Sequence, residues 1–125
     1  MRRTNAILWT IQGLLALNFL LVGSMKLLTP AATLAQLAKP LPVHLLRFIG
    51  ACELTGAFGL VLPGLLRIRQ YLTPLAAAGL VIIMSGAVSA MITLGRLGDA
   101  VGPAILGVLA IIIVYGRTYL APSRP

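Results

Sequence analysis

A chain of 125 residues with 59% hydrophobic and 10% charged residues is too apolar for a soluble domain, in which about 25% of residues are charged. Ten Lys and Arg residues against two acidic ones give a formal net charge of +8. These basic residues lie scattered in short breaks between apolar runs, which is typical of membrane topology signals and not of a nucleic-acid-binding patch. We therefore expect no nucleic acid partner.

Four apolar runs divide the chain, each close to the roughly 20 residues that a helix needs to cross a bilayer. They predict an all-α fold, a four-transmembrane-helix bundle that forms a single integral membrane domain over residues 1–125. The predicted spans cover about 5–28, 43–62, 74–94 and 100–119.

The first run, from Asn5 to Leu28, exceeds the apolar core of a signal peptide and precedes no small-residue cleavage site, so a retained span is expected. The connection after it is the longest. In this connection Thr29 can cap, and Pro30 can begin, a short interfacial helix over about 30–39. We expect that helix to lie on the membrane surface or to fold over the mouth of the bundle.

The later connections carry further boundary signals. Pro63-Gly64 is expected to end the second span, Thr73-Pro74 to begin the third, and Asp99 to cap the fourth after a tight turn. Trp9, Tyr115 and Tyr119 are expected to form an aromatic group at one membrane interface.

Basic residues in short loops predict the orientation. The side that holds both termini carries six, and the other side carries at most four. The six are Arg2, Arg3, Arg67, Arg69, Arg117 and Arg124, and the four are Lys26, Lys39, Arg47 and Arg96. The chain is therefore predicted to be a multi-pass protein of a bacterial inner membrane with both termini cytoplasmic.

Glu53 is the candidate centre of any chemistry, because it lies about ten residues into the second span and so roughly 15 Å from its outer end. A carboxyl group near the bilayer midplane costs about 2.5–3.5 kcal/mol on insertion scales, so it should either face the bundle interior and find a partner there or be protonated. Asn18 is expected at the same depth and is a candidate hydrogen-bond partner. Lys26, on the same face of the first helix, could reach Glu53 with its flexible stem or through a water, or could extend outward to the surface.

Other polar residues have two interpretations each. Ser85 and Ser89 would either complete a polar pocket with Glu53 or bond their own helix backbone and allow close packing. His44 and Arg47 fall on other faces of the second helix. A single histidine and a single cysteine, Cys52, predict no metal site and exclude an intramolecular disulfide. No cofactor is identified.

Short motifs resemble the DoxX-like family of small four-helix membrane proteins. They are Gly23-Ser24-Met25-Lys26-Leu27, Gly50-Ala51-Cys52-Glu53-Leu54, Gly56, Gly59-Leu60 and Pro63. The resemblance implies a four-helix membrane fold in which the positions of Lys26 and Glu53 recur. It also implies an association with sulfur and quinone oxidoreductase systems, with membrane redox complexes or, in distant relatives, with assembly of other membrane proteins. Family members often carry a histidine late in the third helix, and its absence here argues against a redox or proton-transfer role.

Three functions remain open at this point, and the sequence does not decide whether the chain is an enzyme. The first is an accessory or assembly subunit of a bacterial inner-membrane complex. The second is a membrane redox subunit that binds a quinone or another lipophilic small molecule near Glu53. The third is a small proton-coupled exporter, a class that carries its membrane carboxylate in the first helix. The expected partners are the lipid bilayer and, according to the role, a membrane protein, a second copy of the chain or a lipophilic small molecule.

Overall fold

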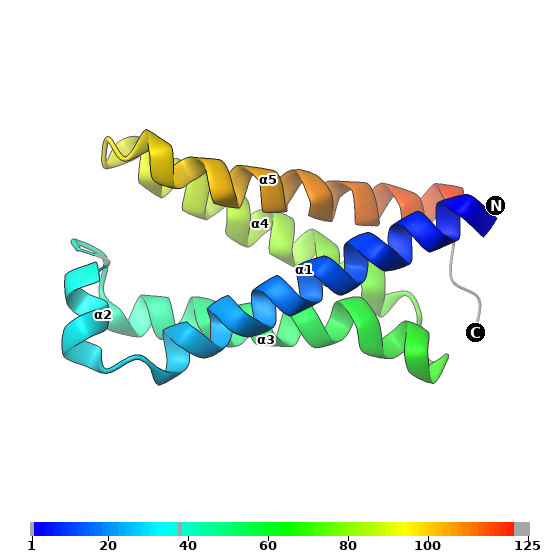
Figure 1. Ribbon diagram of the computed structural model, residues 1–125, viewed down its shortest axis with the longest axis horizontal. Coiled ribbons are helices and arrows are strands. Elements are labelled where there is room, and N and C mark those ends of the chain that lie inside the picture. Colours follow the sequence, from blue (N-terminus) through cyan, green and yellow to red (C-terminus); the bar gives the residue numbers. More distant parts are fainter. Residues whose placement is uncertain (1, 38, 122–125) are drawn as a thin grey trace.

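The computed structural model describes residues 2–37 and 39–121, which are helical apart from short connections and contain no strand (Figure 1). The elements are α1 (Arg2–Leu28), α2 (Ala31–Leu37), α3 (Val43–Leu66), α4 (Leu72–Thr93), α5 (Leu97–Tyr115) and a π-helical turn, η1 (Gly116–Leu120), which continues α5. Four helices are long and apolar enough to cross a membrane: α1, α3, α4 and α5 together with η1. The prediction of an all-α, four-span bundle is confirmed.

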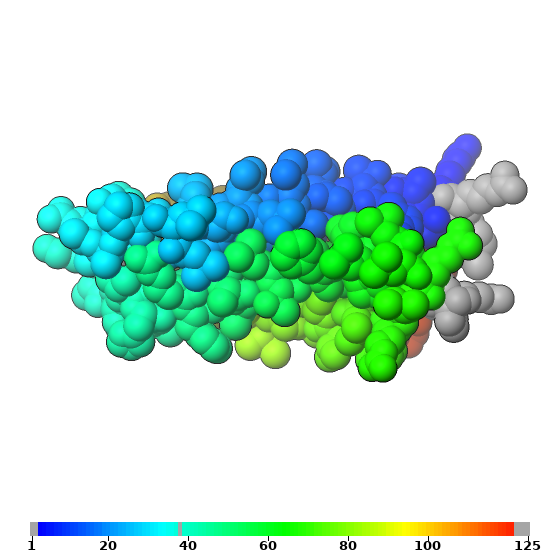
Figure 2. Space-filling view, turned by 90° about the horizontal axis from the view of Figure 1, so that it is seen from below, coloured from blue at the N-terminus to red at the C-terminus, as the bar shows by residue number. Residues whose placement is uncertain are grey.

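The four long helices form two antiparallel pairs. α1 packs mainly on α3, and α4 packs mainly on α5, while α3 and α4 join the pairs. Figure 1 shows the pairs converging toward the end that holds both termini and diverging toward the end that carries α2. We call these the termini end and the α2 end. In Figure 2, α1 and α3 lie side by side along their lengths, with α2 gathered at one end.

A close approach of backbones holds the α1–α3 pair together. A Cβ atom at Gly23 would lie 2.8 Å from the carbonyl oxygen of Gly50, and one at Gly50 would lie 2.8 Å from Cβ of Lys26. Membrane helices associate through small residues of this kind, because lipid tails offer bulky side chains equally good contacts. The contact also sets the register of the pair and brings Lys26 onto α3.

The apolar core fills the space between the pairs, chiefly in the middle and toward the termini end. Its largest fully buried apolar side chains are Phe19, Leu15, Leu60, Leu80 and Ile113. Many other large apolar side chains on all four long helices point outward. An apolar exterior around a packed interior is what a helix bundle in lipid requires.

The predicted end of the second span is wrong, and tertiary packing explains the difference. α3 continues through Pro63 to Leu66, because proline is tolerated in membrane helices that are supported by their neighbours. Gly64 belongs to this packing and not to a turn, since a Cβ there would lie 2.6 Å from the ring of Trp9. The helix ends instead at Arg67, which adopts the left-handed conformation (φ 55°) and bonds through its N–H to the carbonyl of Pro63.

The second correction concerns the turn between α4 and α5. α4 ends in a Schellman motif, in which Gly95 (φ 75°) donates to the carbonyl of Ile92 and Arg96 donates to that of Met91. The motif lets α5 begin at Leu97, earlier than predicted, so Asp99 lies in the first turn and does not cap the helix.

The short helix between the first two spans is present as α2, within the predicted 30–39, of which residue 38 lies outside the described residues. Thr29 closes α1 rather than opening α2, because its hydroxyl donates to the carbonyl of Met25 at 2.5 Å. α4 begins at Leu72, slightly before the predicted Thr73-Pro74 start. Leu34 is buried, so α2 is anchored to the bundle by one apolar side chain.

Candidate ligand site between the helix pairs

Glu53 is fully buried, at 0% exposure, on the face of α3 that points into the bundle. Its Oε1 accepts a hydrogen bond from Nζ of Lys26 at 2.5 Å. The lysine comes from the last turn of α1 and is still partly exposed, with 25% of its side chain accessible. The sequence left open a direct contact, a water bridge or an outward-pointing Lys26, and the structure shows the direct contact.

The second carboxylate oxygen of Glu53 has no such partner. Oε2 is buried and makes no hydrogen bond to any residue that the structure describes. A buried polar atom without a partner loses its hydration and gains nothing in return, at a typical cost of about 1–3 kcal/mol and more for a charged group. Native proteins contain few such atoms, and each needs an explanation. Among the described residues the other is Nη2 of Arg117, at the termini end.

Arg47 holds the end of α1 in place beside the pair. Its Nη1 donates to the carbonyl oxygen of Lys26 at 3.1 Å and to that of Leu27. The last carbonyls of a helix have no partners within it, so this side chain caps α1 from α3. Although Arg47 lies on a different face from Glu53, as predicted, it supports the site by fixing the backbone from which Lys26 extends.

A cavity of about 490 Å³ opens beside the ion pair, where the two helix pairs diverge. Its volume is within the range of about 300–1,000 Å³ that is typical of small-molecule sites. Its polar lining consists of the buried Glu53 with the partly exposed Lys26, and of Arg96 with Asp99. The apolar wall consists of Leu37, Leu41, Leu45, Leu46, Ile49, Ile83, Met84, Gly86, Ala87, Ala90, Met91 and Pro103. Part of the predicted cap over the bundle mouth, Leu37 at the end of α2, therefore does line the cavity.

A second ion pair lies on the wall of the same cavity, nearer to solvent. Nε of Arg96 donates to Oδ2 of Asp99 at 2.7 Å, and both side chains are substantially exposed. The cavity thus has apolar walls, one buried charged pair with an unmet oxygen and one exposed charged pair. This polarity suits a molecule that is mostly apolar with a polar head.

A model of the DoxX-like family matches residues 10–113, a segment that contains Lys26, Glu53 and the rest of the cavity wall. The chain belongs to the DoxX-like family. No curated protein and no solved structure matches it significantly. Family membership and the four apolar helices agree on a multi-pass membrane protein.

Asn18 of this DoxX-like protein does not contact Glu53. It is exposed on the outside of α1, so the expected hydrogen bond between them is wrong. The inward stripe of α1 runs through Leu15, Phe19 and Gly23 to Lys26. Residues eight apart on a helix differ by about 80° in direction, so Asn18 is turned away when Lys26 faces α3.

Ser85 and Ser89 also stay apart from the ion pair of the DoxX-like protein. Both are exposed and line a separate groove of about 310 Å³ between α4 and α5. The hydroxyl of Ser85 donates to the carbonyl of Val81 at 2.8 Å, which is the backbone bonding that the sequence left as an alternative. Neither serine joins Lys26 and Glu53 in one pocket.

Arg117 is the polar residue whose position sequence reasoning missed. It was counted as a loop charge, yet only 4% of it is exposed. Its Nε donates to Oε1 of Gln12 at 2.6 Å, and its Nη1 donates to Oδ1 of Asn5 at 2.8 Å and to the carbonyl of Ala121 at 3.0 Å. Gln12 in turn donates to the carbonyl of Leu60 at 2.6 Å, so the termini end of the bundle is tied together by hydrogen bonds.

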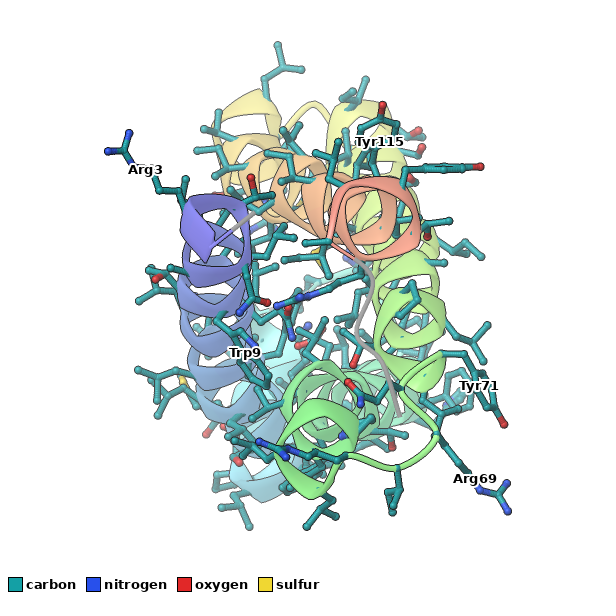
Figure 3. The ribbon with its side chains drawn as sticks, turned by 90° about the vertical axis from the view of Figure 1, so that its right-hand side faces the viewer. Arg3, Trp9, Arg69, Tyr71 and Tyr115 are labelled. Carbon is teal, nitrogen blue, oxygen red and sulfur yellow. The ribbon has the colours of Figure 1, made fainter. Side chains whose placement is uncertain are left out.

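The aromatic residues at the termini end of this DoxX-like protein divide between interior and surface. Seen from that end, Trp9 lies between α1 and α3, while Tyr71 and Tyr115 point outward (Figure 3). The Arg117 guanidinium lies 5.5 Å from the centroid of the Trp9 ring, a cation–π distance. The expected single interfacial group of Trp9 with Tyr115 and Tyr119 is therefore wrong for Trp9. The two tyrosines do pair, with ring centroids 5.3 Å apart.

His44 is exposed and Cys52 half-buried, and within the described residues no group of three metal-ligating side chains comes together. Gln12 and Asn5, polar residues inside the first apolar run, were the available signals for a buried partner near the termini. Assigning every basic residue to membrane topology leaves no place for Arg117 as their buried partner.

Proposed function

We propose that this DoxX-like protein binds a lipophilic small molecule in the cavity between the helix pairs, with the molecule's polar head against Lys26 and Glu53. The observation that carries the proposal is Oε2 of Glu53, a buried oxygen without a partner among the described residues, on the wall of an apolar cavity of about 490 Å³. A purely structural ion pair would be stabler with both carboxylate oxygens bonded.

The interior favours this function over a proton-coupled exporter. An exporter needs a path that can open to both sides of the membrane. Here the cavity is confined to the α2 end, and the other half is filled by packed side chains such as Leu15 and Leu60 and tied by Arg117. A cavity confined to one end of the bundle suits a molecule that is bound and held.

This function is compatible with a role as a subunit of a bacterial inner-membrane complex. In that case the DoxX-like chain is the subunit that binds the ligand. The exposed apolar faces of its four long helices leave room for a neighbouring membrane protein or a second copy. Ligand binding is the more specific proposal, because lipid covers such faces as well as a partner does.

The orientation proposed is that both termini are cytoplasmic, so that the cavity lies in the outer half of the membrane. Its support is the exposed basic residues. Arg3, Arg67 and Arg69 are exposed at the termini end, while Lys39 is exposed and Arg96 half-exposed at the α2 end. The bias of the positive-inside rule persists although Arg117, Lys26 and Arg47 are engaged within the bundle.

Copurification tests the proposal. The protein is purified in mild detergent from its native membrane, and its organic extract is compared by mass spectrometry with those of two variants. Ala87→Phe places a ring in the cavity, and Ala6→Phe adds the same ring on an exposed face of α1. The expected result is a lipophilic compound in wild type and Ala6→Phe that is lost in Ala87→Phe. Equal recovery of every lipophilic compound from all three proteins would contradict it.

A further inference from the structure

We infer that the head of the bound molecule is a hydroxyl group, as in a lipophilic phenol or alcohol, and not a group that only accepts or only donates hydrogen bonds. The inference rests on the proposed function and specifies its ligand. It follows from the hydrogen bonding of Lys26 and Glu53, the less exposed of the two ion pairs on the cavity wall, taken together with the apolar residues of that wall.

The free oxygen of Glu53 requires a donor. Nζ of Lys26 forms an ion pair with Oε1 at 2.5 Å, and the carboxylate of an ion pair accepts hydrogen bonds but donates none. Oε2 is buried and has no partner among the described residues. A ligand head with only carbonyl or ether oxygens would leave Oε2 unbonded and place a second acceptor beside it.

Lys26 adds the opposite requirement. Its ammonium group carries three N–H donors, and one bonds to Glu53. With a quarter of the side chain still accessible and the residue on the cavity wall, further N–H donors can bond a ligand acceptor. An amine head would offer Oε2 its donors but would meet like charge at Lys26. A hydroxyl group has one donor and two lone pairs, so a single O–H can donate to Glu53 and accept from Lys26.

Water satisfies the same two groups less well at this position. A buried water typically needs about three hydrogen bonds, and the residues next to the pair on the wall are apolar, among them Ile49, Met84 and Ala87. A water there would have Lys26 and Glu53 as its buried polar partners. A hydroxyl on an apolar body makes the same two bonds and also buries that body against the wall.

The experiment compares two probes that differ in one hydrogen-bond donor. Para-hexylphenol and its methyl ether, para-hexylanisole, are added to the full chain in lipid nanodiscs, and binding is measured by equilibrium dialysis after subtraction of partitioning into empty nanodiscs. We expect the phenol to bind at least about tenfold more tightly, because a hydrogen bond to a charged group contributes about that factor or more.

Variants test whether Glu53 causes the preference for the phenol over its methyl ether. In Glu53→Gln we expect the preference for the phenol to fall below about threefold, because the neutral amide replaces a charged acceptor. Asn18→Leu, which removes a polar side chain exposed on the outside of α1 and away from the cavity, should keep the wild-type preference. Retention of the full preference in Glu53→Gln would overturn the assignment to Glu53.

Binding to the wild-type protein alone tests the hydroxyl inference and the proposed function separately, whether or not a variant folds. Equally tight binding of phenol and ether would overturn the hydroxyl inference and leave the proposed function standing. Binding of neither probe above the lipid background would overturn the proposed function itself.

Discussion

The two ends of this bundle stabilise a buried charge by different interactions. At the α2 end, Lys26 and Glu53 form an ion pair that leaves a carboxylate oxygen unbonded beside a cavity. At the termini end, Arg117 has no acidic partner among the described residues and is bonded instead by Gln12, Asn5 and a backbone carbonyl, in a region where the helix pairs converge. Each charge keeps one buried atom without a hydrogen bond to the described residues, Oε2 of Glu53 and Nη2 of Arg117. Oε2 belongs to a residue that lines a cavity, which marks the binding end, whereas Arg117 lies where the helix pairs converge, which marks the closing end.

The largest effect on stability is expected where a substitution leaves a buried charge without its counter-ion. Lys26→Met leaves Glu53 buried without its counter-ion, so the free energy of unfolding in detergent should fall by about 3–5 kcal/mol. Adding Glu53→Gln should recover at least half of the loss, because the stranded charge is then gone. Lys39→Met, at an exposed lysine of the same end, is the control and should change stability by less than about 0.5 kcal/mol. An unchanged stability in Lys26→Met would mean that the pair does not form in the membrane.

At the termini end, Gln12→Leu should destabilise the protein by about 2–3 kcal/mol, because it removes a hydrogen bond to the Arg117 guanidinium and leaves that group buried. Gln36→Leu changes the same residue type on the exposed side of α2 and should be close to neutral. If the two variants unfold alike in a detergent titration, Arg117 is not held as described and the contrast between the ends is lost.

The packing of the α1–α3 pair predicts a smaller effect. Gly50→Ala places a Cβ 2.8 Å from Cβ of Lys26, and overpacking of this kind costs about 1–3 kcal/mol. The same substitution at Gly13, where no atom lies within 4 Å of the added Cβ, should be neutral or slightly stabilising. Thermal unfolding in the same detergent separates the two, and a stable Gly50→Ala would show that the backbones of α1 and α3 are further apart.

The smallest effect is expected at the cavity rim. Arg96 and Asp99 form an exposed ion pair, and such pairs contribute about 0–1 kcal/mol. Asp99→Asn should therefore shift the unfolding midpoint little. A loss as large as that of Lys26→Met would show that the rim is buried and would remove the difference between the two ion pairs.

Sequence reasoning succeeded where a local signal decides the structure. Pro42 directly precedes α3, whose start at Val43 was predicted, and Glu53 faces the interior because a carboxyl group in an apolar span has nowhere else to go. The partner of Glu53 was among the alternatives, since Lys26 was known to lie within reach of a flexible stem.

Sequence reasoning failed where the rotation of a helix about its axis, or its packing on neighbouring helices, determines the position of a residue. Asn18 was placed by depth, which fixes the height of a residue but not its direction, and the Gly23–Gly50 contact turns it outward. Pro63 was treated as a helix end because the packing of Gly64 on Trp9 has no signature in a single sequence. Arg117 was treated as a surface charge, since its neutral partners lie more than a hundred positions earlier in the chain.

The central claim, that the α2 end binds and the termini end closes, is tested most directly by photoaffinity labelling. A para-substituted phenol with a diazirine on its alkyl chain is irradiated with the protein in nanodiscs, and modified residues are mapped with and without excess para-hexylphenol. The expected result is labelling of cavity residues such as Ile49, Met84 and Met91 that the competitor suppresses. Labelling that the competitor leaves unchanged, or suppressible labelling at Leu15 and Leu60 in the packed half, would contradict the claim.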